Sequence, residues 1–226
     1  MSDGKPAKPV KKPRRGKVTR DKIIEVAENL IAQQGPDGFQ LQNVTEQLGI
    51  TPPAIYNHFK DREDLVAHIA EKGGKMLAAV MRRNSGDDIL TSLRRNARRY
   101  VDFLVDNPAH ARIILWDLAR RGTSGWRGLA ASNMEMRERM RSAFEAAAER
   151  GEIRPISIET YLQYLYIGTA AGAIWTDHDY PGPGNDGQPP APLRKPTPDE
   201  VDFLKNQAED LAVRLLSPDL GEVERL

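Results

Sequence analysis

The chain has 226 residues, a formal net charge of +1 and 39% apolar residues, a composition typical of one or two globular domains. The absence of cysteine excludes disulfides, a thiol nucleophile and thiolate metal ligands. The longest apolar run, residues 161–175, is short for a membrane span, and the N-terminus lacks the apolar stretch of a signal peptide. We therefore expect a cytoplasmic protein with no membrane partner.

The N-terminus is strongly basic. Residues 1–20 contain eight Lys or Arg against one Asp, together with three prolines and almost no apolar residues. Such a segment cannot bury enough apolar surface to fold alone, so we expect a disordered basic arm over residues 1–18. Its charge suggests a polyanionic partner, most simply nucleic acid, although a passive solubilising tail is the alternative.

Four helices are predicted in the first part of the chain. Thr19 is placed to cap the first, which ends at Gly35. A short helix covers about residues 41–48, and another begins after Thr51. Asp61 caps the fourth, which runs to about residue 83. The first three of these helices favour a three-helix N-terminal domain over residues 19–64.

Five more helices are predicted over residues 65–226, which we expect to form a second domain. They span about 88–106, 107–121, a segment ending at 151, 157–176, and a last helix opened by a capping box of Thr197 and Glu200. No window alternates strictly between apolar and polar residues, so the expected fold is all-α with about nine helices. In residues 177–196, nine of twenty positions are Pro or Gly, and we expect a mobile loop there.

Residues 41–60 have the layout of a helix-turn-helix. Gly49 supplies the left-handed backbone that the tight turn needs, and Thr51 stands at the N-cap of the second helix. Pro52 and Pro53 fit this helix start, but they remove backbone N–H donors that would otherwise bind a phosphate. The apolar residues predicted to hold the two helices together are Val44, Leu48, Ile50, Ile55 and Phe59.

The second helix of this unit would enter a DNA major groove by its N-terminal end. Pro and Ala side chains suit contacts with thymine methyl groups, and Asn57 either pairs with adenine or faces solvent. Tyr56 and His58 would hold phosphates, with a plain surface position as the alternative for each. The outward residues are Pro52, Pro53, Ala54, Tyr56, Asn57, His58 and Lys60.

Residues 19–69 resemble the DNA-binding domain of the TetR family of transcriptional regulators. The resemblance lies in the amphipathic first helix ending in Gly35, in the LGIT turn (48–51), and in the YNHF-K-DREDL segment (56–65) that leads into the fourth helix. It implies a homodimer that reads an inverted-repeat operator and is released by a small-molecule effector bound in the C-terminal domain. Repression is the commoner behaviour in the family. The motif positions that it marks as DNA-contacting are Gln42, Thr51, Pro52, Pro53, Ala54, Tyr56, His58 and Arg62.

Three positions depart from the family pattern. The family usually has Thr where Gln40 and Leu41 stand, which puts the N-cap and a phosphate contact of the second helix in doubt. It usually has Ala where Thr45 stands, a change that we expect to affect packing only. It usually has Lys where Arg62 stands, and Arg would keep the charge and could hold a phosphate with two hydrogen bonds.

The C-terminal domain is expected to hold a pocket for a bulky, largely apolar effector. Aromatic and Met side chains at helical spacing would suit such a pocket, although ordinary core packing gives the same spacing. Helix 158–176 is apolar on nearly all sides, so it would bury one face in the domain and one against a partner subunit. The aromatic, Met and Ile residues that the domain offers for such a pocket are Phe103, Trp116, Trp126, Met134, Met136, Tyr164, Ile167 and Trp175.

Gly73 and Gly74 lie at the centre of the predicted fourth helix, where each costs about 1 kcal/mol relative to Ala. They favour either a hinge between the two domains or a close approach of another helix.

Other function classes find little support. No Gly-rich loop follows a strand, and the four histidines form no catalytic pattern, so an enzyme is not expected. Asp177, His178 and Asp179 are neighbours along a loop and are not expected to bind one metal ion; no cofactor is predicted. The remaining alternative is a DNA-binding protein that acts without an effector, either constitutively or architecturally.

Overall fold

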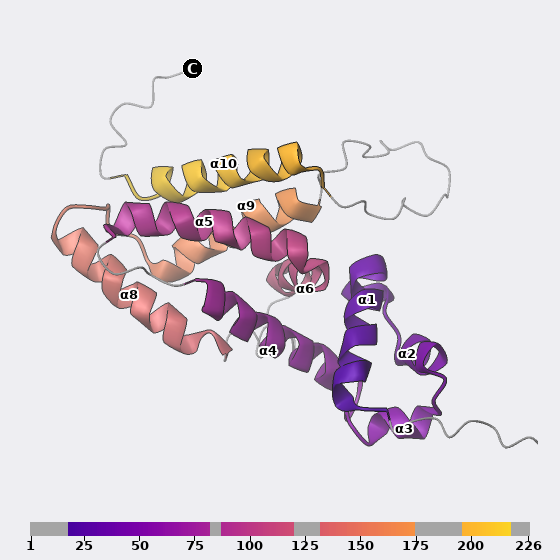
Figure 1. Ribbon diagram of the computed structural model, residues 1–226. Coiled ribbons are helices and arrows are strands. Elements are labelled where there is room, and N and C mark those ends of the chain that lie inside the picture. Colours follow the sequence, from indigo (N-terminus) through magenta and orange to yellow (C-terminus); the bar gives the residue numbers. More distant parts are fainter. Residues whose placement is uncertain (1–17, 82–86, 120–131, 175–195, 218–226) are drawn as a thin grey trace, which may run out of the picture.

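The computed structural model describes residues 18–81, 87–119, 132–174 and 196–217 (Figure 1). Within these ranges the protein forms nine helices and no strand, which confirms the all-α prediction. The basic arm, the loop at 177–196 and its Asp-His-Asp sequence lie almost entirely outside the described residues. The helices are α1 (Arg20–Gly38), α2 (Leu41–Leu48), α3 (Pro52–Tyr56), α4 (Arg62–Val80), α5 (Ile89–Asp106), α6 (Pro108–Ala119), α8 (Met134–Glu149), α9 (Ile158–Ile174) and α10 (Pro198–Arg214).

The predicted capping residues begin their helices. The side chain of Thr19 accepts a hydrogen bond from the Lys22 amide, and that of Asp61 accepts one from the Asp64 amide. Thr197 and Glu200 form the reciprocal bonds of the capping box. Such caps satisfy amide groups that have no partner inside the helix, so short polar sequences fix where these helices start.

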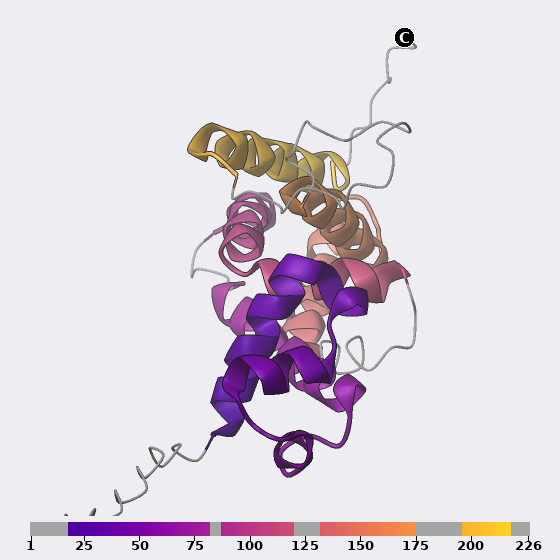
Figure 2. The same ribbon diagram turned by 90° about the vertical axis from the view of Figure 1, so that its right-hand side faces the viewer.

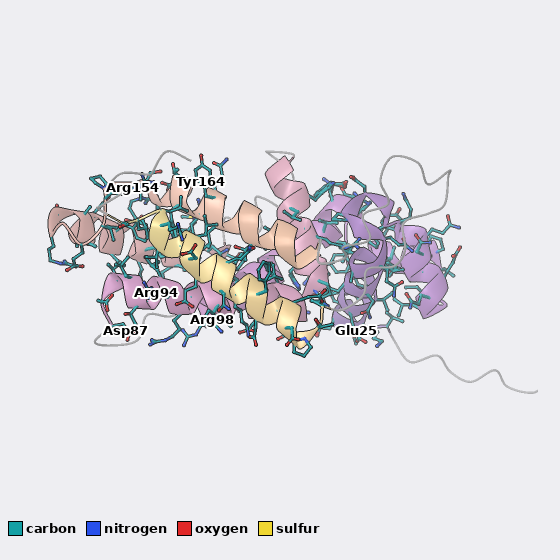
Figure 3. The ribbon with its side chains drawn as sticks, turned by 90° about the horizontal axis from the view of Figure 1, so that it is seen from above. Glu25, Asp87, Arg94, Arg98, Arg154 and Tyr164 are labelled. Atoms are coloured by element: carbon teal, nitrogen blue, oxygen red, sulfur yellow. The ribbon has the colours of Figure 1, made fainter. Side chains whose placement is uncertain are left out.

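Two apolar cores lie at opposite ends of the molecule. Helices α1–α3 and the first half of α4 form an N-terminal head, and α5, α8, α9 and α10 with the end of α4 form a C-terminal body (Figures 1 and 2). In the body, α10 packs on α5 and α9. Seen from above, α10 crosses α5 and α9 (Figure 3). An ion pair between Arg98 of α5 and Glu209 of α10, at 3.3 Å, links two of these helices.

Two helices belong to both ends of the molecule. The N-terminal half of α4 packs into the head through Leu65 and Ile69, and its C-terminal half packs into the body through Leu77. Helix α6 contributes Ala109 and Ile113 to the head core but Ala111 and Ile114 to the body core. The head core therefore extends beyond residue 64, and α6 is anchored on both sides.

Some helix details differ from the sequence expectation. The first helix does stop at Gly35, where φ is +75°, but a short second helical stretch containing Pro36 continues to Gly38. The apolar spacing of the sequence predicts that Leu65, Ile69, Met76 and Val80 share the inward face of α4, but Val80 is exposed and Leu77 is the buried neighbour instead. The reason is that α4 changes partners from head to body halfway along its length, so its buried face shifts around the helix.

None of the helices within the described ranges is both long enough and apolar enough to span a membrane.

Candidate nucleic-acid interface and effector pocket

Helices α2 and α3 with their connection form a helix-turn-helix. Gly49 adopts φ +62°, the left-handed conformation that the turn requires. Its amide bonds to the Glu46 carbonyl, and the Ile50 amide bonds to the Thr45 carbonyl at 3.0 Å, so the end of α2 is closed by backbone groups. Figure 2 shows the unit at the far end of the head, away from the body.

The predicted apolar contacts hold the two helices together. Val44, Ile55 and Phe59 are fully buried, while Leu48 and Ile50 are half-buried at the edge. Thr45 is buried as well, and its hydroxyl donates to the Gln42 carbonyl at 2.8 Å. A Thr in place of a smaller residue is accommodated here because this hydrogen bond satisfies its polar atom.

The start of α3 has the expected geometry with one difference. Thr51 occupies the N-cap position with extended backbone, and Pro52 and Pro53 fill the first two helical positions. However, the Thr51 side chain makes no capping bond; it is the Thr51 carbonyl that accepts from the Ala54 amide at 2.9 Å. Because the prolines carry no N–H, a capping hydroxyl has little to bond, and the Thr51 side chain faces solvent instead.

The surface of the helix-turn-helix exposes most of the predicted contact residues. The ring of Tyr56 is 57% exposed, while Ala54 and His58 are half-buried. Gln42 is exposed on α2, where its amide donates to Glu46 at 2.8 Å. The fully exposed positions of the turn and α3 are Thr51, Pro52, Pro53, Tyr56, Asn57 and Lys60.

Arg62 does not join this surface. Its Nε donates to the Phe39 carbonyl at 2.9 Å, its Nη2 donates to the Pro36 carbonyl, and its Nη1 pairs with Glu63 at 2.9 Å. The guanidinium also lies over the Phe39 ring, 5.7 Å from the centroid. The side chain expected to hold a phosphate is therefore turned into the head.

The N-cap of α2 matches the departure seen in the sequence. Gln40 stands at that position in extended conformation, and its side chain makes no capping bond. The first amide groups of α2 are consequently left to backbone turns, such as the bond from the Asn43 amide to the Gln40 carbonyl at 3.1 Å.

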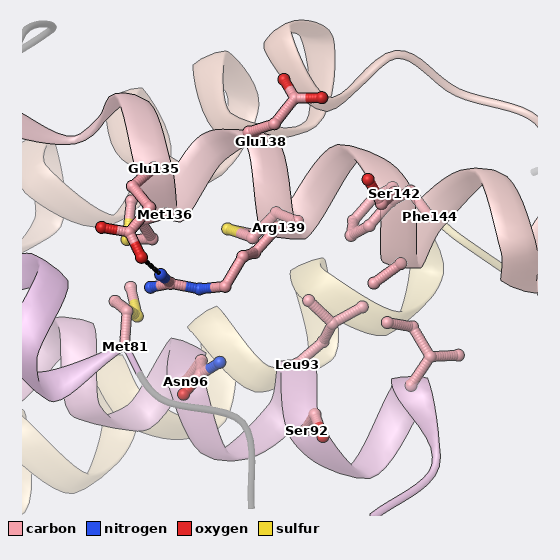
Figure 4. Close-up of a pocket in the computed structure, with 13 residues that line it drawn as sticks. Met81, Ser92, Leu93, Asn96, Glu135, Met136, Glu138, Arg139, Ser142 and Phe144 are labelled. Atoms are coloured by element: carbon pink, nitrogen blue, oxygen red, sulfur yellow. Dashed lines mark hydrogen bonds and ion pairs between the residues drawn. The ribbon is translucent and has the colours of Figure 1, made fainter.

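The body contains an open pocket of about 600 Å³ between α5 and α8, next to the end of α4 (Figure 4). Its polar rim includes Asn96 and the ion pair of Arg139 with Glu135, drawn across the opening in Figure 4. Deeper lies Ser92, which is 5% exposed and whose hydroxyl has no hydrogen-bond partner among the described residues. The apolar lining consists of Met81, Ile89, Leu93, Met136, Met140, Ala143 and Phe144.

Of the residues that the sequence offered for an effector pocket, Met136 lines this pocket and the others that the structure describes do not. Phe103 is buried and lines a second, smaller cleft between α4 and α5, and Trp116 is half-buried beside the head core. Met134 and Tyr164 are 69% and 58% exposed, and Tyr164 points outward from α9 (Figure 3). Trp126 and Trp175 lie outside the described residues, as does the side chain of Ile167 on α9.

Sequence reasoning offered mostly bulky aromatic residues and so missed all of this pocket except Met136. Its signal is the Met content of two amphipathic helices, since Met81 ends α4 while Met136 and Met140 are one turn apart on α8. Met side chains adapt to irregular spaces, which makes them good lining residues for a pocket as well as for a core.

Residues 23–69 match the sequence model of the family described as bacterial regulatory proteins, tetR family. The N-terminal head is therefore similar to the DNA-binding domain of that family. The match covers α1, α2, α3 and the first part of α4.

Comparison with whole proteins extends the likeness. An uncharacterized HTH-type transcriptional regulator of Bacillus subtilis (strain 168), YobS, is 31% identical over 98 residues, which are 41% of this chain and 49% of that protein. The chain thus aligns with about half the length of that relative.

Solved structures show the same fold around the TetR-type domain. A transcriptional regulator FadR from Bacillus subtilis, crystallised with stearoyl-CoA, has a TM-score of 0.62 at 16% identity and covers 87% of this chain and 99% of its own. AibR, crystallised with isovaleryl coenzyme A and operator DNA, has a TM-score of 0.56 at 19% identity and covers 83% and 96%. At these identities the likeness shows the fold alone.

Proposed function

We propose that this protein is a ligand-responsive transcriptional regulator, a repressor that leaves an inverted-repeat operator when a small effector binds its body. The observation that carries the proposal is the TetR-type helix-turn-helix, which presents an exposed face of α3 at the end of the head. A regulator of this kind acts where the chromosome lies, so we place it in the cytoplasm, and we assign it no catalytic role.

The exposed face of α3 supports a particular division of contacts. Pro52, Pro53 and Ala54 offer apolar surface that suits thymine methyl groups in the major groove. Tyr56 and Lys60 offer a hydroxyl and an ammonium group for the phosphate backbone. With two prolines at its start, α3 has few free amides for phosphate binding, so these side chains carry most of the backbone contacts.

The pocket between α5 and α8 supports a largely apolar effector. Its Met, Leu and Phe lining would bury an apolar body, while Ser92 and Asn96 could fix one polar group. Two proteins of similar fold were crystallised with acyl-CoA molecules, stearoyl-CoA in FadR and isovaleryl-CoA in AibR. Their acyl chains are the kind of apolar group that this lining would accept.

Exposed aromatic residues on α9 and α10 support a homodimer. Tyr164 of α9 and Phe203 of α10 are large side chains with more than half of their surface in solvent. The two helices pack against each other, so they can present a joint surface to a second copy of the chain. Two heads related by a two-fold axis would then read an inverted repeat.

The direct test is a gel shift of the full chain with the DNA upstream of its own gene. We expect a palindromic site to be bound far more tightly than a scrambled site, with an affinity that falls steeply as salt rises. Absence of any palindrome preference at low salt would rule out the regulator. The alternative, a DNA-binding protein without effector, predicts that stearoyl-CoA, isovaleryl-CoA and a broad library of apolar compounds all leave operator affinity unchanged.

A further inference from the structure

The first residue of α4 is bonded back to the segment that precedes the helix-turn-helix. The two carbonyls that accept from Arg62 belong to Pro36 and Phe39, between the end of α1 and the start of α2. They lie 26 and 23 positions before Arg62 in the chain. The segment between these positions contains α2, the turn and α3. The Arg62 side chain therefore joins the two ends of this helix-turn-helix segment.

All three nitrogens of the guanidinium are engaged in this arrangement. Each of its three nitrogens donates to an acceptor within the head, two to carbonyls and one to the Glu63 carboxylate. The side chain is only 21% exposed, and its plane lies over the Phe39 ring. Turning the guanidinium outward to a phosphate on the surface of α3 would break these bonds and leave two partly buried carbonyls without their donors.

The other contacts of the loop give it cohesion but little direction. Val44, Ile55 and Phe59 attach α2 and α3 to the head through apolar packing, which depends on buried area and tolerates small rotations. The planar fork of Arg, in contrast, fixes both the distance and the angle between the groups it joins. The Arg62 bonds therefore fix the start of α4, which directly follows α3 in the chain, against the connection between α1 and α2.

We propose that Arg62 is a positioning residue for operator binding, one that orients α3 by joining the two ends of the helix-turn-helix and that makes no contact with DNA phosphate. The proposal rests on the proposed DNA-binding function. It assigns Arg62 a role different from the phosphate contact that the TetR-family motif implies for its position.

The test compares Arg62→Lys, Arg62→Gln and the charge control Lys75→Gln on the palindrome that the parent binds. Lys75 is an exposed residue of α4 outside the head core. Dissociation constants are measured over a salt series, well below the melting temperature of each variant. Because Lys keeps the charge but not the fork, we expect both Arg62 variants to bind about tenfold more weakly or worse, with the salt slope of the parent. Lys75→Gln should match the parent in both quantities.

Two outcomes would overturn the proposal. A salt slope reduced by about 0.9 in Arg62→Gln, with Arg62→Lys restored to the parent, would show a phosphate contact. Parental affinity in both folded Arg62 variants would show that the bonds stabilise the head without orienting α3. If the parent protein itself shows no preference for a palindrome, both the proposed regulatory function and the role of Arg62 are wrong. Either of the two outcomes above would contradict only the role of Arg62 and would leave the proposed function intact.

Discussion

The imidazole of His110 on α6 occupies the space that a side chain at Gly73 on α4 would need. A Cβ built at Gly73 would lie 2.9 Å from both Cγ and Nε2 of that ring, closer than real Cβ contacts occur. His110 is 5% exposed, and its Nε2 lies 3.6 Å from Glu28 of α1. The glycine thus lets α6 approach α4 and α1 at the junction of head and body, which favours close packing over the hinge alternative.

A double-mutant cycle on this pair separates packing from flexibility. Gly73→Ala alone should lower the free energy of unfolding by about 1–2 kcal/mol, because the new methyl group meets the His110 ring. In a His110→Ala background the same change should be neutral or stabilising by up to about 1 kcal/mol, since the space is free and Ala favours the helix. Urea denaturation of the four proteins gives the coupling energy. An equal change in the free energy of unfolding in both backgrounds would show that the His110 ring does not restrict residue 73, and the hinge would then be the better explanation of this glycine.

Burial of His110 also predicts a pH dependence of stability. Burial lowers the pKa of His110, Glu28 opposes the shift, and Lys72, which pairs with Glu28 at 2.8 Å, reinforces it. From α5 the ring of Phe103 faces it, with centroids 6.1 Å apart. The folded state therefore binds fewer protons at this site than the unfolded state. Its stabilising contribution is complete above the unfolded value of about 6.5 and is lost as the pH falls below it.

The measurement compares the parent with His110→Gln, which cannot titrate. Between pH 7.5 and 5.5 the parent should lose more free energy of unfolding than the variant, by at most about 1.4 kcal/mol per pH unit. The comparison cancels the contributions of the other histidines and of the carboxylates. Parallel curves for the two proteins would show that His110 keeps the same pKa when the chain folds.

The helix-turn-helix could be predicted from sequence because its determinants are local. Gly49 must adopt a positive φ, and Ile55 with Phe59 repeats at helical spacing, so each signal lies within a few residues. Local patterns of this kind determine both the helix boundaries and the buried face.

The roles that depend on distant residues could not be predicted in this way. Arg62 had the charge for a phosphate contact, but its acceptors are carbonyls more than 20 positions away. Gly73 left two possibilities open because its partner, His110, lies on a helix whose approach no short pattern encodes. The pocket between α5 and α8 likewise depends on the distance between two helices, and residue type alone pointed to Met134 and Tyr164, which are exposed.

The buried hydroxyl of Ser92 in the pocket leads to a prediction about the stability of the protein. A buried hydroxyl without a partner costs about 1–3 kcal/mol, so Ser92→Ala should raise the free energy of unfolding by about 1 kcal/mol. Ser142→Ala serves as the control, since Ser142 lines the same pocket but is exposed, and it should change little. Urea denaturation without added ligand measures both. A loss of stability in Ser92→Ala would show that the hydroxyl has a partner in solution, for example an ordered water.

The prolines at the start of α3 lead to the last prediction. Pro52 and Pro53 are exposed at the first two helical positions, where they stiffen the turn and supply no N–H. Replacing both with Ala leaves the buried contacts of Ile55 and Phe59 unchanged, so the head should stay folded. The change returns two amides to the helix start and removes the rigid apolar surface that we assign to thymine methyl groups.

The double variant should therefore prefer different bases at the positions that α3 reads while keeping a comparable affinity for DNA in general. Selection of palindromes from a random-sequence library, performed in parallel on the parent and the variant, measures this preference, and circular dichroism checks the fold. A loss of about 1–3 kcal/mol at each thymine contact is the scale expected for a base-reading surface. If both proteins select the same sequence with the same ranking of single-base changes, the prolines only start the helix, and Ala54 and Asn57 remain as the candidates for reading bases.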